Sequence, residues 1–326
     1  MVFYIGRRIL SAISVVLVVI IVSFALFFIA PTDPAGAVCG SRCTPARVAS
    51  ITHALNLDKP KPEQVADYFE GLFVGHTTVV DGAKVVCSAP CLGYSYKLSE
   101  PVTELLGRAI PVTISIVIGG AVVFLLIGVT TGVIAARFRG TLRDRVTVVL
   151  TQGLGAIPYF IWILLWRIYG ARGFPQTNYT SIFSNPLDWI TGLLLAWVAF
   201  GIFDGMIYTR YVRGYMIESL GEDYVRTARA KGVSERRILW KHALRATLTP
   251  ITTIVGLDLA AQLTGALITE KILQLPGLGM ITLNAFNNYD LPVLMGAAIF
   301  GSGVLVLMNL VVDIIYTFVD PRVRLS

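Results

Sequence analysis

Four cysteines are the residues of this sequence whose spacing most directly suggests covalent chemistry. They form two C-x3-C pairs, Cys39 with Cys43 and Cys87 with Cys91. Cysteines in an oxidising compartment usually form disulfides. We therefore expect two disulfides, with three possible connectivities, and a structural zinc site is the alternative. Either arrangement would stiffen a segment too small to bury a large core.

Two polar side chains, Asp258 and Gln262, stand inside an otherwise apolar run. A charged side chain at the centre of a membrane span costs roughly 2.5–3.5 kcal/mol on insertion scales. Residues four apart lie on one face of a helix. We expect this face either to line an aqueous cavity or to make a polar contact with another helix.

Two further acidic residues, Asp204 and Asp313, interrupt apolar runs in the same way. Both are expected nearer the cytoplasmic ends of their spans. Snorkelling toward the interface, or pairing with basic neighbours such as Arg210 or Arg322, is the expectation there.

The sequence lacks the residue patterns of catalysis and of nucleotide binding. No G-x-x-x-x-G-K-[ST] phosphate loop occurs. The three histidines, His53, His76 and His242, have no metal-ligand spacing, and no Ser/His/Asp or Cys/His set shares one element. We expect a chain that is not an enzyme and binds no cofactor or metal itself.

The elements that must position these residues are long apolar helices. Of the 326 residues, 55% are hydrophobic and only 14% are charged, whereas soluble domains carry about 25% charged residues. A helix crosses the hydrocarbon core with roughly 20 residues. Six segments have this length: 9–32, 109–136, 146–166, 189–209, 246–269 and 291–312. The sequence therefore predicts an all-α membrane protein with six spans.

Basic residues indicate the orientation of these spans. They gather at Arg7-Arg8 and in the segments 137–145, 210–245 and 322–324. Lys and Arg favour the cytoplasmic side, so both termini are expected to be cytoplasmic. The net charge of +7 then follows from the topology and requires no nucleic acid.

The segment 31–101, between the first two spans, is expected outside the cell and contains all four cysteines. Apolar residues at helical spacing predict a helix over 62–73. Two short valine-rich runs flank Asp81-Gly82, which predicts a hairpin with a tight turn. The segment is thus a small extracellular α+β insertion.

The basic stretch 224–250 separates the fourth and fifth spans. Ser219 and Glu222 match the S-x-x-E capping pattern that opens a helix, Gly232 is expected to end that helix, and Ser234 to cap the next one. An amphipathic helix on lipid headgroups would explain the charge. It would not explain the small residues Ala228 and Gly232, which allow another surface to approach closely.

Specific motifs add a family resemblance. Residues 227–232 read TARAKG and residues 242–245 read HALR, which is similar to the cytoplasmic loop of B-type permease subunits of dipeptide and oligopeptide ABC importers. In the general permease pattern EAA-x3-G-x9-I-x-L-P, the Glu, the first Ala, the Ile and the Pro are replaced here. Other segments resemble the same family: LDKP at 57–60, LGYSY at 92–96 with Pro101-Val102, PGLG at 276–279, and Asp290 with Pro292. The resemblance covers nearly the whole chain, except the cysteine-bearing loop. Among the oligopeptide permease B-like proteins, the chain resembles the actinobacterial, mycobacterium-like members more than the enteric ones.

This resemblance implies a type I ABC importer permease fold in a bacterial inner membrane. It divides the chain into an N-terminal span (1–30), the extracellular domain (31–101) and a five-helix core (102–326) with a coupling loop at 219–249. The implied partners are a second homologous permease, one or two ABC ATPase subunits that bind ATP and Mg, an extracellular peptide-binding protein, and lipids.

The resemblance also implies which residues act. ATPase coupling falls on Arg226, Thr227, Ala228, Arg229, Ala230, Lys231 and Gly232. Within this set, Ala228 and Gly232 are expected in close contact, with Arg229 and Lys231 as polar partners. The candidates for the translocation path are Asp258, Gln262 and Glu270.

Three other functions stay open. A permease of the same family could carry another solute delivered by a binding protein, such as nickel or glutathione. A single-component secondary transporter usually shows internal repeats, and none is visible. A membrane receptor or anchor for an ATPase is the third.

Overall fold

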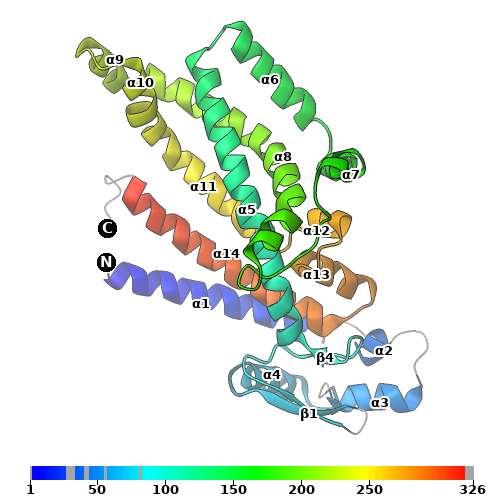
Figure 1. The fold of residues 1–326 in the computed structure, drawn as a ribbon. Coiled ribbons are helices and arrows are strands. Elements are labelled where there is room, and N and C mark those ends of the chain that lie inside the picture. The colour runs from blue at the N-terminus through cyan, green and yellow to red at the C-terminus, as the bar shows by residue number, and fades with distance from the viewer. Residues whose placement is uncertain (1, 27–33, 40–43, 55–56, 81–82, 320–326) are drawn as a thin grey trace. The chain divides into compact units, whose positions relative to one another are not determined.

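The computed structural model describes residues 2–26, 34–39, 44–54, 57–80 and 83–319. The chain forms two compact units (Figure 1). Unit 1 comprises Met1–Thr113 and Pro276–Val306, and unit 2 comprises Ile114–Leu275 and Leu307–Ser326. Helices α5 (Val102–Arg137) and α14 (Leu291–Val319) each contribute to both units.

Unit 1 contains the segment that was expected outside the cell. Its helices are α1 (Val2–Phe24), α2 (Pro34–Cys39), α3 (Pro45–Ala54), α4 (Lys61–Val74) and α13 (Leu278–Asn287). The strands β1 (His76–Val80) and β2 (Ala83–Cys87) pair antiparallel, as do β3 (Tyr94–Ser95) and β4 (Glu100–Pro101). The predicted helix and hairpin are confirmed, although the turn residues 81–82 lie outside the described residues.

Local chemistry explains where α4 begins and ends. Pro60 precedes the helix and Pro62 lies in its first turn, where a missing N–H leaves no hydrogen bond unmade. Glu63 in the same turn is favourable for the helix dipole. Gly75 ends the helix with a φ of 87°, a conformation that glycine adopts without strain.

The core of unit 1 joins this outer segment to two long helices. One hydrophobic cluster contains Phe24 of α1, Ile51 of α3, Tyr94 of β3 and Met295 of α14, all buried. A second cluster packs the start of α5 against α13 and α14 around Leu106, Leu278 and Val293. The outer segment therefore shares a core with α1 and the start of α14.

Unit 2 is almost entirely helical. After α5 come α6 (Leu142–Gly155), α7 (Tyr159–Tyr169), η2 (Gly170–Gly173) and α8 (Pro186–Gly221). Then follow α9 (Asp223–Ala230), α10 (Glu235–Arg237), the π-helical η3 (Ile238–Ala243), α11 (Leu244–Leu263) and α12 (Leu267–Leu273). Its main core gathers Phe124 of α5, Tyr208 and Met216 of α8, and Ile251 of α11.

Glycines bring α5 and α8 into close contact. A Cβ built on Gly120 would lie 2.0 Å from the ring of Phe200, and one on Gly128 would lie 2.5 Å from Tyr208 Cβ. No side chain fits at either position. At these two positions, glycine therefore allows the two helices to pack closely.

Four helices of the described chain are long and apolar enough to cross a membrane. They are Val102–Arg137, Pro186–Gly221, Glu235–Leu263 and Leu291–Ile315. The pair α6 and α7 passes the same test together and would make a fifth span. In the first predicted span, the apolar helix within the described residues is the shorter segment Ile13–Phe24.

The third predicted span, 146–166, is not one continuous helix. Helices α6 and α7 meet at an angle of 93°. Pro158 stands immediately before α7, with ψ at 138°, and its nitrogen carries no hydrogen to continue the helical hydrogen bonds. The run carries no charged residue, so its composition alone does not mark this break.

The fifth predicted span, 246–269, also ends early. Helix α11 stops at Leu263 and α12 starts at Leu267. Gly265 between them has a φ of 145°, which interrupts the helical path. Pro250, by contrast, lies inside α11 and does not end it.

Candidate functional site

The candidate site is the segment that joins α8 to α11. Helix α9 ends at Ala230, and Gly232 turns the chain with a φ of 74°. The Gly232 N–H donates to the Arg229 carbonyl at 2.9 Å, and the Val233 N–H donates to the Ala228 carbonyl at 3.1 Å. These bonds satisfy carbonyls at the end of the helix, as expected of a glycine C-terminus. The predicted glycine corner is confirmed.

The predicted capping box before α9 is wrong. Ser219 belongs to the last turn of α8, which runs on to Gly221. Glu222 occupies the N-cap position of α9 without a side-chain cap bond. Ser234 likewise occupies the N-cap of α10, but its side chain makes no cap bond. The S-x-x-E pattern is present at Ser219 and Glu222, but it opens no helix there because α8 runs on to Gly221.

Buried contacts hold α9 against its neighbours. Val225 is completely buried, as are Ile238 and Ala243 of η3. The Ser219 hydroxyl donates to the Ala243 carbonyl at 3.2 Å, which ties the end of α8 to the end of η3. The segment therefore forms one packed corner with the helices on both sides of it.

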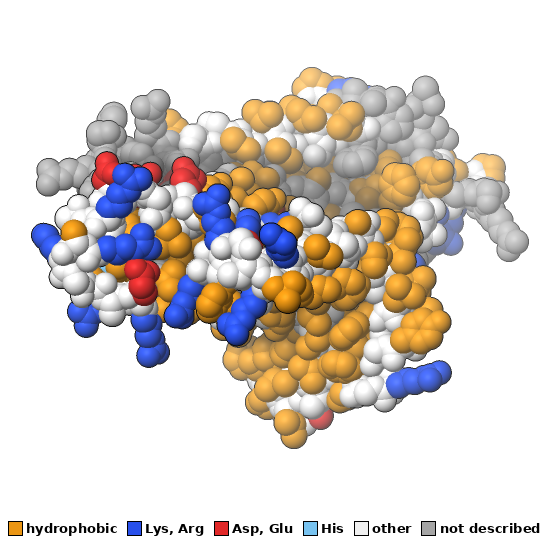
Figure 2. Space-filling view, turned by 90° about the horizontal axis from the view of Figure 1, so that it is seen from above, with side chains coloured by type: hydrophobic (Ala, Val, Ile, Leu, Met, Phe, Trp, Pro, Cys, Tyr) orange, Lys and Arg blue, Asp and Glu red, His pale blue; other side chains and the backbone are white. Residues whose placement is uncertain are grey.

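The seven predicted coupling residues lie on the outer side of this corner. All are exposed except Ala228, which is half-buried. Figure 2 shows Lys and Arg side chains gathered over the part of the surface that α9 and α10 occupy. The structure thus presents an exposed basic segment that includes the small residues Ala230 and Gly232.

Arg229 has a partner within this surface. Its Nε donates to Glu235 Oε1 at 2.7 Å, so the ion pair bridges the glycine corner from α9 to α10. This hydrogen bond raises the pKa of the Arg229 guanidinium above its usual value. Arg229 therefore bridges the corner, while 44% of its side chain stays exposed.

A cavity of about 350 Å³ lies on the inner side of α9. It is lined by residues of the end of α8, of α9 and of α11: Tyr215, Glu218, Ser219, Glu222, Tyr224, Ala246, Thr247 and Pro250. The segment therefore buries Val225 against its neighbours and borders this cavity beside Val225.

The predicted intramembrane residues of α11 meet residues of α8. The Tyr208 hydroxyl donates to Asp258 Oδ2 at 2.6 Å. Gln262 Nε2 donates to Asp204 Oδ2 at 3.2 Å. The expected pairing of Asp204 with Arg210 is therefore wrong, because Asp204 turns toward α11. Of the two alternatives for Asp258 and Gln262, these bonds favour the polar contact between helices.

The remaining acidic candidates lie elsewhere. Glu270 lies in α12 and is completely buried. Asp313 lies in α14, and Arg322, its predicted partner, lies outside the described residues.

Sequence reasoning missed two residue pairs. Tyr208 could have been found, because it stands four residues after Asp204 on the same helix face. Asp144 of α6 and Arg213 of α8 carry no such signal. Asp144 is buried and accepts from Arg213 Nε at 2.6 Å, from Arg213 Nη2 at 2.8 Å and from the Gly140 N–H at 2.9 Å.

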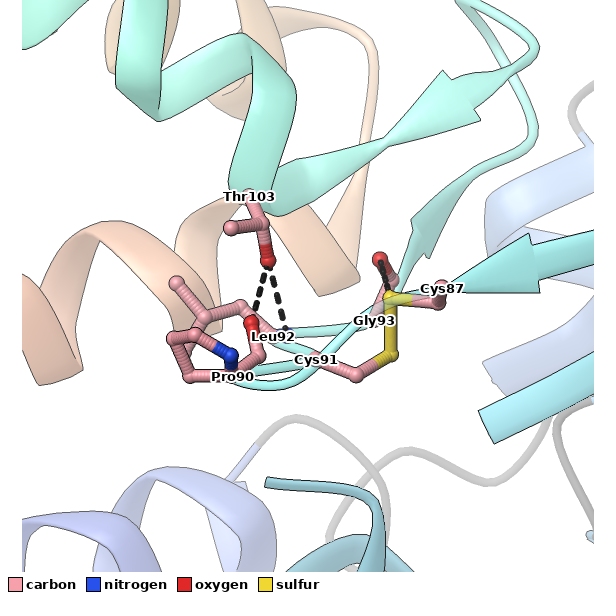
Figure 3. The surroundings of a disulfide bond; sticks show 6 residues. All are labelled: Cys87, Pro90, Cys91, Leu92, Gly93 and Thr103. Atoms are coloured by element: carbon pink, nitrogen blue, oxygen red, sulfur yellow. Dashed lines mark hydrogen bonds between the residues drawn. A yellow bond between two sulfur atoms is a disulfide. The ribbon is translucent and has the colours of Figure 1, made fainter. Parts of the chain in front are cut away.

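The cysteine prediction is answered in part. Cys87 and Cys91 form a disulfide with a Cα–Cα distance of 5.4 Å, which excludes a zinc site at this pair (Figure 3). Cys39 is also disulfide-bonded, and Cys43 lies outside the described residues.

Thr103, in the first turn of α5, fastens the loop that this disulfide closes. Its hydroxyl donates to the Pro90 carbonyl at 2.6 Å and accepts from the Leu92 N–H at 3.3 Å (Figure 3). The disulfide loop and the start of α5 are therefore packed together within unit 1.

Comparison with known proteins identifies the family. Residues 128–325 match the family described as "Binding-protein-dependent transport system inner membrane component". Residues 1–117 match its N-terminal companion, "Binding-prot-dependent transport system membrane comp, N-term". These two matches cover most of both units.

Curated relatives align over almost the whole chain. A probable peptide ABC transporter permease protein, y4tP, of Sinorhizobium fredii (strain NBRC 101917 / NGR234) is 33% identical over 98% of this chain and 99% of its own length. A putative peptide transport system permease protein of Brucella abortus (strain 2308) is 33% identical, with 98% of each chain covered. The dipeptide transport system permease protein DppB of Escherichia coli (strain K12) is 30% identical, again over 98% of each. This chain therefore belongs to the family of binding-protein-dependent transport system inner membrane components.

Proposed function

We propose that this chain is a permease subunit of an ATP-driven importer of peptides. It would form half of the translocation path and receive movement from ATPase subunits through α9 and the Gly232 corner. The observation that carries this proposal is the exposed, basic corner packed between α8 and α11, in a chain whose relatives are named as peptide and dipeptide permeases.

The proposed complex contains a second homologous permease, one or two ABC ATPase subunits and an extracellular peptide-binding protein. ATP and Mg would be bound by the ATPase subunits, because this chain has no phosphate loop. In this arrangement the chain catalyses no reaction itself. Six spans, with both termini and the 219–249 loop in the cytoplasm and residues 31–101 outside, agree with the distribution of basic residues.

The polar residues Asp258, Gln262 and Glu270 are proposed to lie along or next to the path. The contacts of Asp258 and Gln262 with α8 support a role in setting the shape of the path rather than in contacting peptide as free side chains. Glu270, buried in α12, would hold the helix that follows the break at Gly265.

The test of coupling is a pair of glycine variants in the reconstituted complex. Gly232→Trp places a large side chain at the corner, where a Cβ added to Gly232 would have nothing within 4 Å. We expect loss of ATPase subunits from the purified complex and at least a tenfold loss of peptide uptake. The measurements are co-purification and uptake of labelled di-, tri- and longer peptides.

Gly140→Trp is the matched control. Gly140 also has a positive φ, of 80°, also has open space around it, and lies outside the α9 corner. The control should keep its ATPase subunits. Unchanged assembly and uptake in the Gly232 variant would contradict the docking role of this corner.

A further inference from the structure

Three contacts join α8 to α11 at matched positions. Asp204 meets Gln262, Tyr208 meets Asp258, and Ser219 meets the Ala243 carbonyl next to α11. As the residue number rises along α8, its partner's number falls. The two helices are therefore antiparallel, and the first two contacts share one register. The third contact, at the end of η3, is offset from that register by four residues.

The first two contacts form what we call the polar ladder: Asp204 with Gln262, and Tyr208 with Asp258. Within each helix the two ladder residues are four apart, so they lie on one face. Tyr208 is only 2% exposed. Its ring stacks on Phe124 of α5, with centroids 4.5 Å apart, which fixes the direction of its hydroxyl.

The ladder stands in the apolar part of both helices. Each carboxylate accepts a hydrogen bond from a neutral donor of the other helix. Tyr208 is buried, so little water can reach its hydroxyl to replace a lost partner. Sliding α8 along α11 would leave both carboxylates without their donors, so the ladder opposes sliding more strongly than apolar packing alone.

The coupling segment, residues 222–243, connects α8 to α11 at one end of this pair of helices. Val225 and Ala243 are buried there. A push on α9 reaches both helices at once. It moves them together only if they cannot slide past one another.

We propose that Asp204, Tyr208, Asp258 and Gln262 are positioning residues for transport: the polar ladder makes α8 and α11 one lever, so that movement of α9 reaches the translocation path. This inference rests on the proposed function and extends it to residues that touch neither ATPase nor peptide. Loss of a ladder contact lets the helices slip, so ATP hydrolysis continues while less peptide moves for each ATP consumed.

The test measures peptide imported per ATP hydrolysed in liposomes that contain the full complex and its binding protein. Tyr208→Phe removes only the donor hydroxyl, and Gln262→Met removes the amide at similar volume. We expect each to lower the ratio about threefold, the effect of one interhelical hydrogen bond of average strength in a membrane. Hydrolysis should stay near the wild-type rate.

Two controls separate the ladder from general damage. Tyr211→Phe makes the same chemical change three residues further along α8, at a tyrosine that is 41% exposed, and should keep the wild-type ratio. The exchanged pair Asp204→Gln with Gln262→Asp keeps the combined length and the donor–acceptor match. It should restore most of the ratio lost in Gln262→Met.

The outcomes are distinct. A wild-type ratio in both Tyr208→Phe and Gln262→Met overturns the ladder proposal and leaves the proposed function intact. A lower yield of complex with an unchanged ratio also overturns it, because the residues then only stabilise the fold. If the wild-type complex imports no peptide, the proposed function fails first.

Discussion

At the scale of single residues, Asp290 shows how unit 1 uses a buried carboxyl group. Only 2% of this residue is exposed, and the fully buried Ser95 donates its hydroxyl hydrogen to Asp290 Oδ2. Burial raises the pKa of Asp290, while the Ser95 hydroxyl, the Val293 N–H and the charge of Lys97 act in the opposite direction. Asp290 precedes α14, so this bond ties β3 to the start of that helix.

Because burial raises the pKa of Asp290, ionising it in the folded protein costs free energy. This cost is absent below the unfolded value of 3.8, grows as the pH rises, and is complete above the folded pKa. Asp290→Asn keeps an acceptor for Ser95 and removes the charge. We expect it to melt about 2–4 °C above wild type near pH 7, which corresponds to roughly 1 kcal/mol.

Thermal unfolding between about pH 4 and pH 8 checks this prediction. The difference between Asp290→Asn and wild type should shrink toward the acid end. Asp223→Asn, at a side chain that is 95% exposed, should show no comparable trend. A variant less stable than wild type at neutral pH would mean that Ser95 and its neighbours stabilise the ionised form.

At the scale of elements, close packing and breaks shape the helices of unit 2. Gly128 brings α5 against Tyr208 of α8, the residue that also carries one contact of the polar ladder. Pro158 and Gly265 interrupt two apolar runs. Small residues thus set the distances between helices, and the interruptions set their directions.

Gly128→Ala and Gly107→Ala make the same change at two positions of α5. The new Cβ at Gly128 would lie 2.5 Å from Tyr208 Cβ and 3.2 Å from its backbone carbon, whereas nothing lies within 4 Å at Gly107. We expect Gly128→Ala to lose roughly 1–3 kcal/mol through overpacking. Gly107→Ala should be neutral or gain up to about 1 kcal/mol from helix propensity.

Denaturant or thermal unfolding of both variants in the same detergent checks the comparison. Equal stabilities would contradict the close approach of α5 and α8. A Gly128→Ala variant that also imports less peptide per ATP would extend the effect to the ladder residue it contacts.

At the scale of the whole molecule, the proposed topology places the cysteines and the α9 corner on opposite sides of the membrane. The cysteines Cys39, Cys87 and Cys91 are disulfide-bonded. Ala230 at the corner is exposed. One labelling experiment on intact cells can therefore test on which side of the membrane the cysteines and the α9 corner each lie.

A membrane-impermeant thiol reagent should not label the wild-type chain until the cells are treated with a reductant. An introduced thiol, Ala230→Cys, should stay unlabelled in intact cells and react after permeabilisation. Labelling of Ala230→Cys from outside would reverse the orientation, and strong labelling of wild type without reductant would contradict the disulfides.

The sequence predicted the features that depend on local chemistry. Gly232 marked the corner because glycine adopts a positive φ without strain, and the short motif TARAKG indicated the family that the comparisons confirm. The helix α4 and the hairpin of β1 and β2 followed from apolar spacing and turn residues.

Features that depend on distant residues could not be predicted. Asp204 and Gln262 are 58 positions apart, and only the register of two packed helices brings them together. The break before α7 was not predicted because proline is tolerated in membrane helices, so Pro158 alone did not separate a kink from a sharp turn. The capping pattern at Ser219 failed because packing extended α8 past it.

The cavity beside α9 has a consequence for inhibition. A small compound filling this hollow would brace the coupling corner against Pro250 and Tyr215 and stop it from moving relative to the helices it joins. Under the proposed function, such a compound would halt import without competing with nucleotide or with peptide. Resistance would then arise through substitutions of the residues that line the cavity. Compounds that bind the ATPase subunits or the peptide site would keep their potency against such variants.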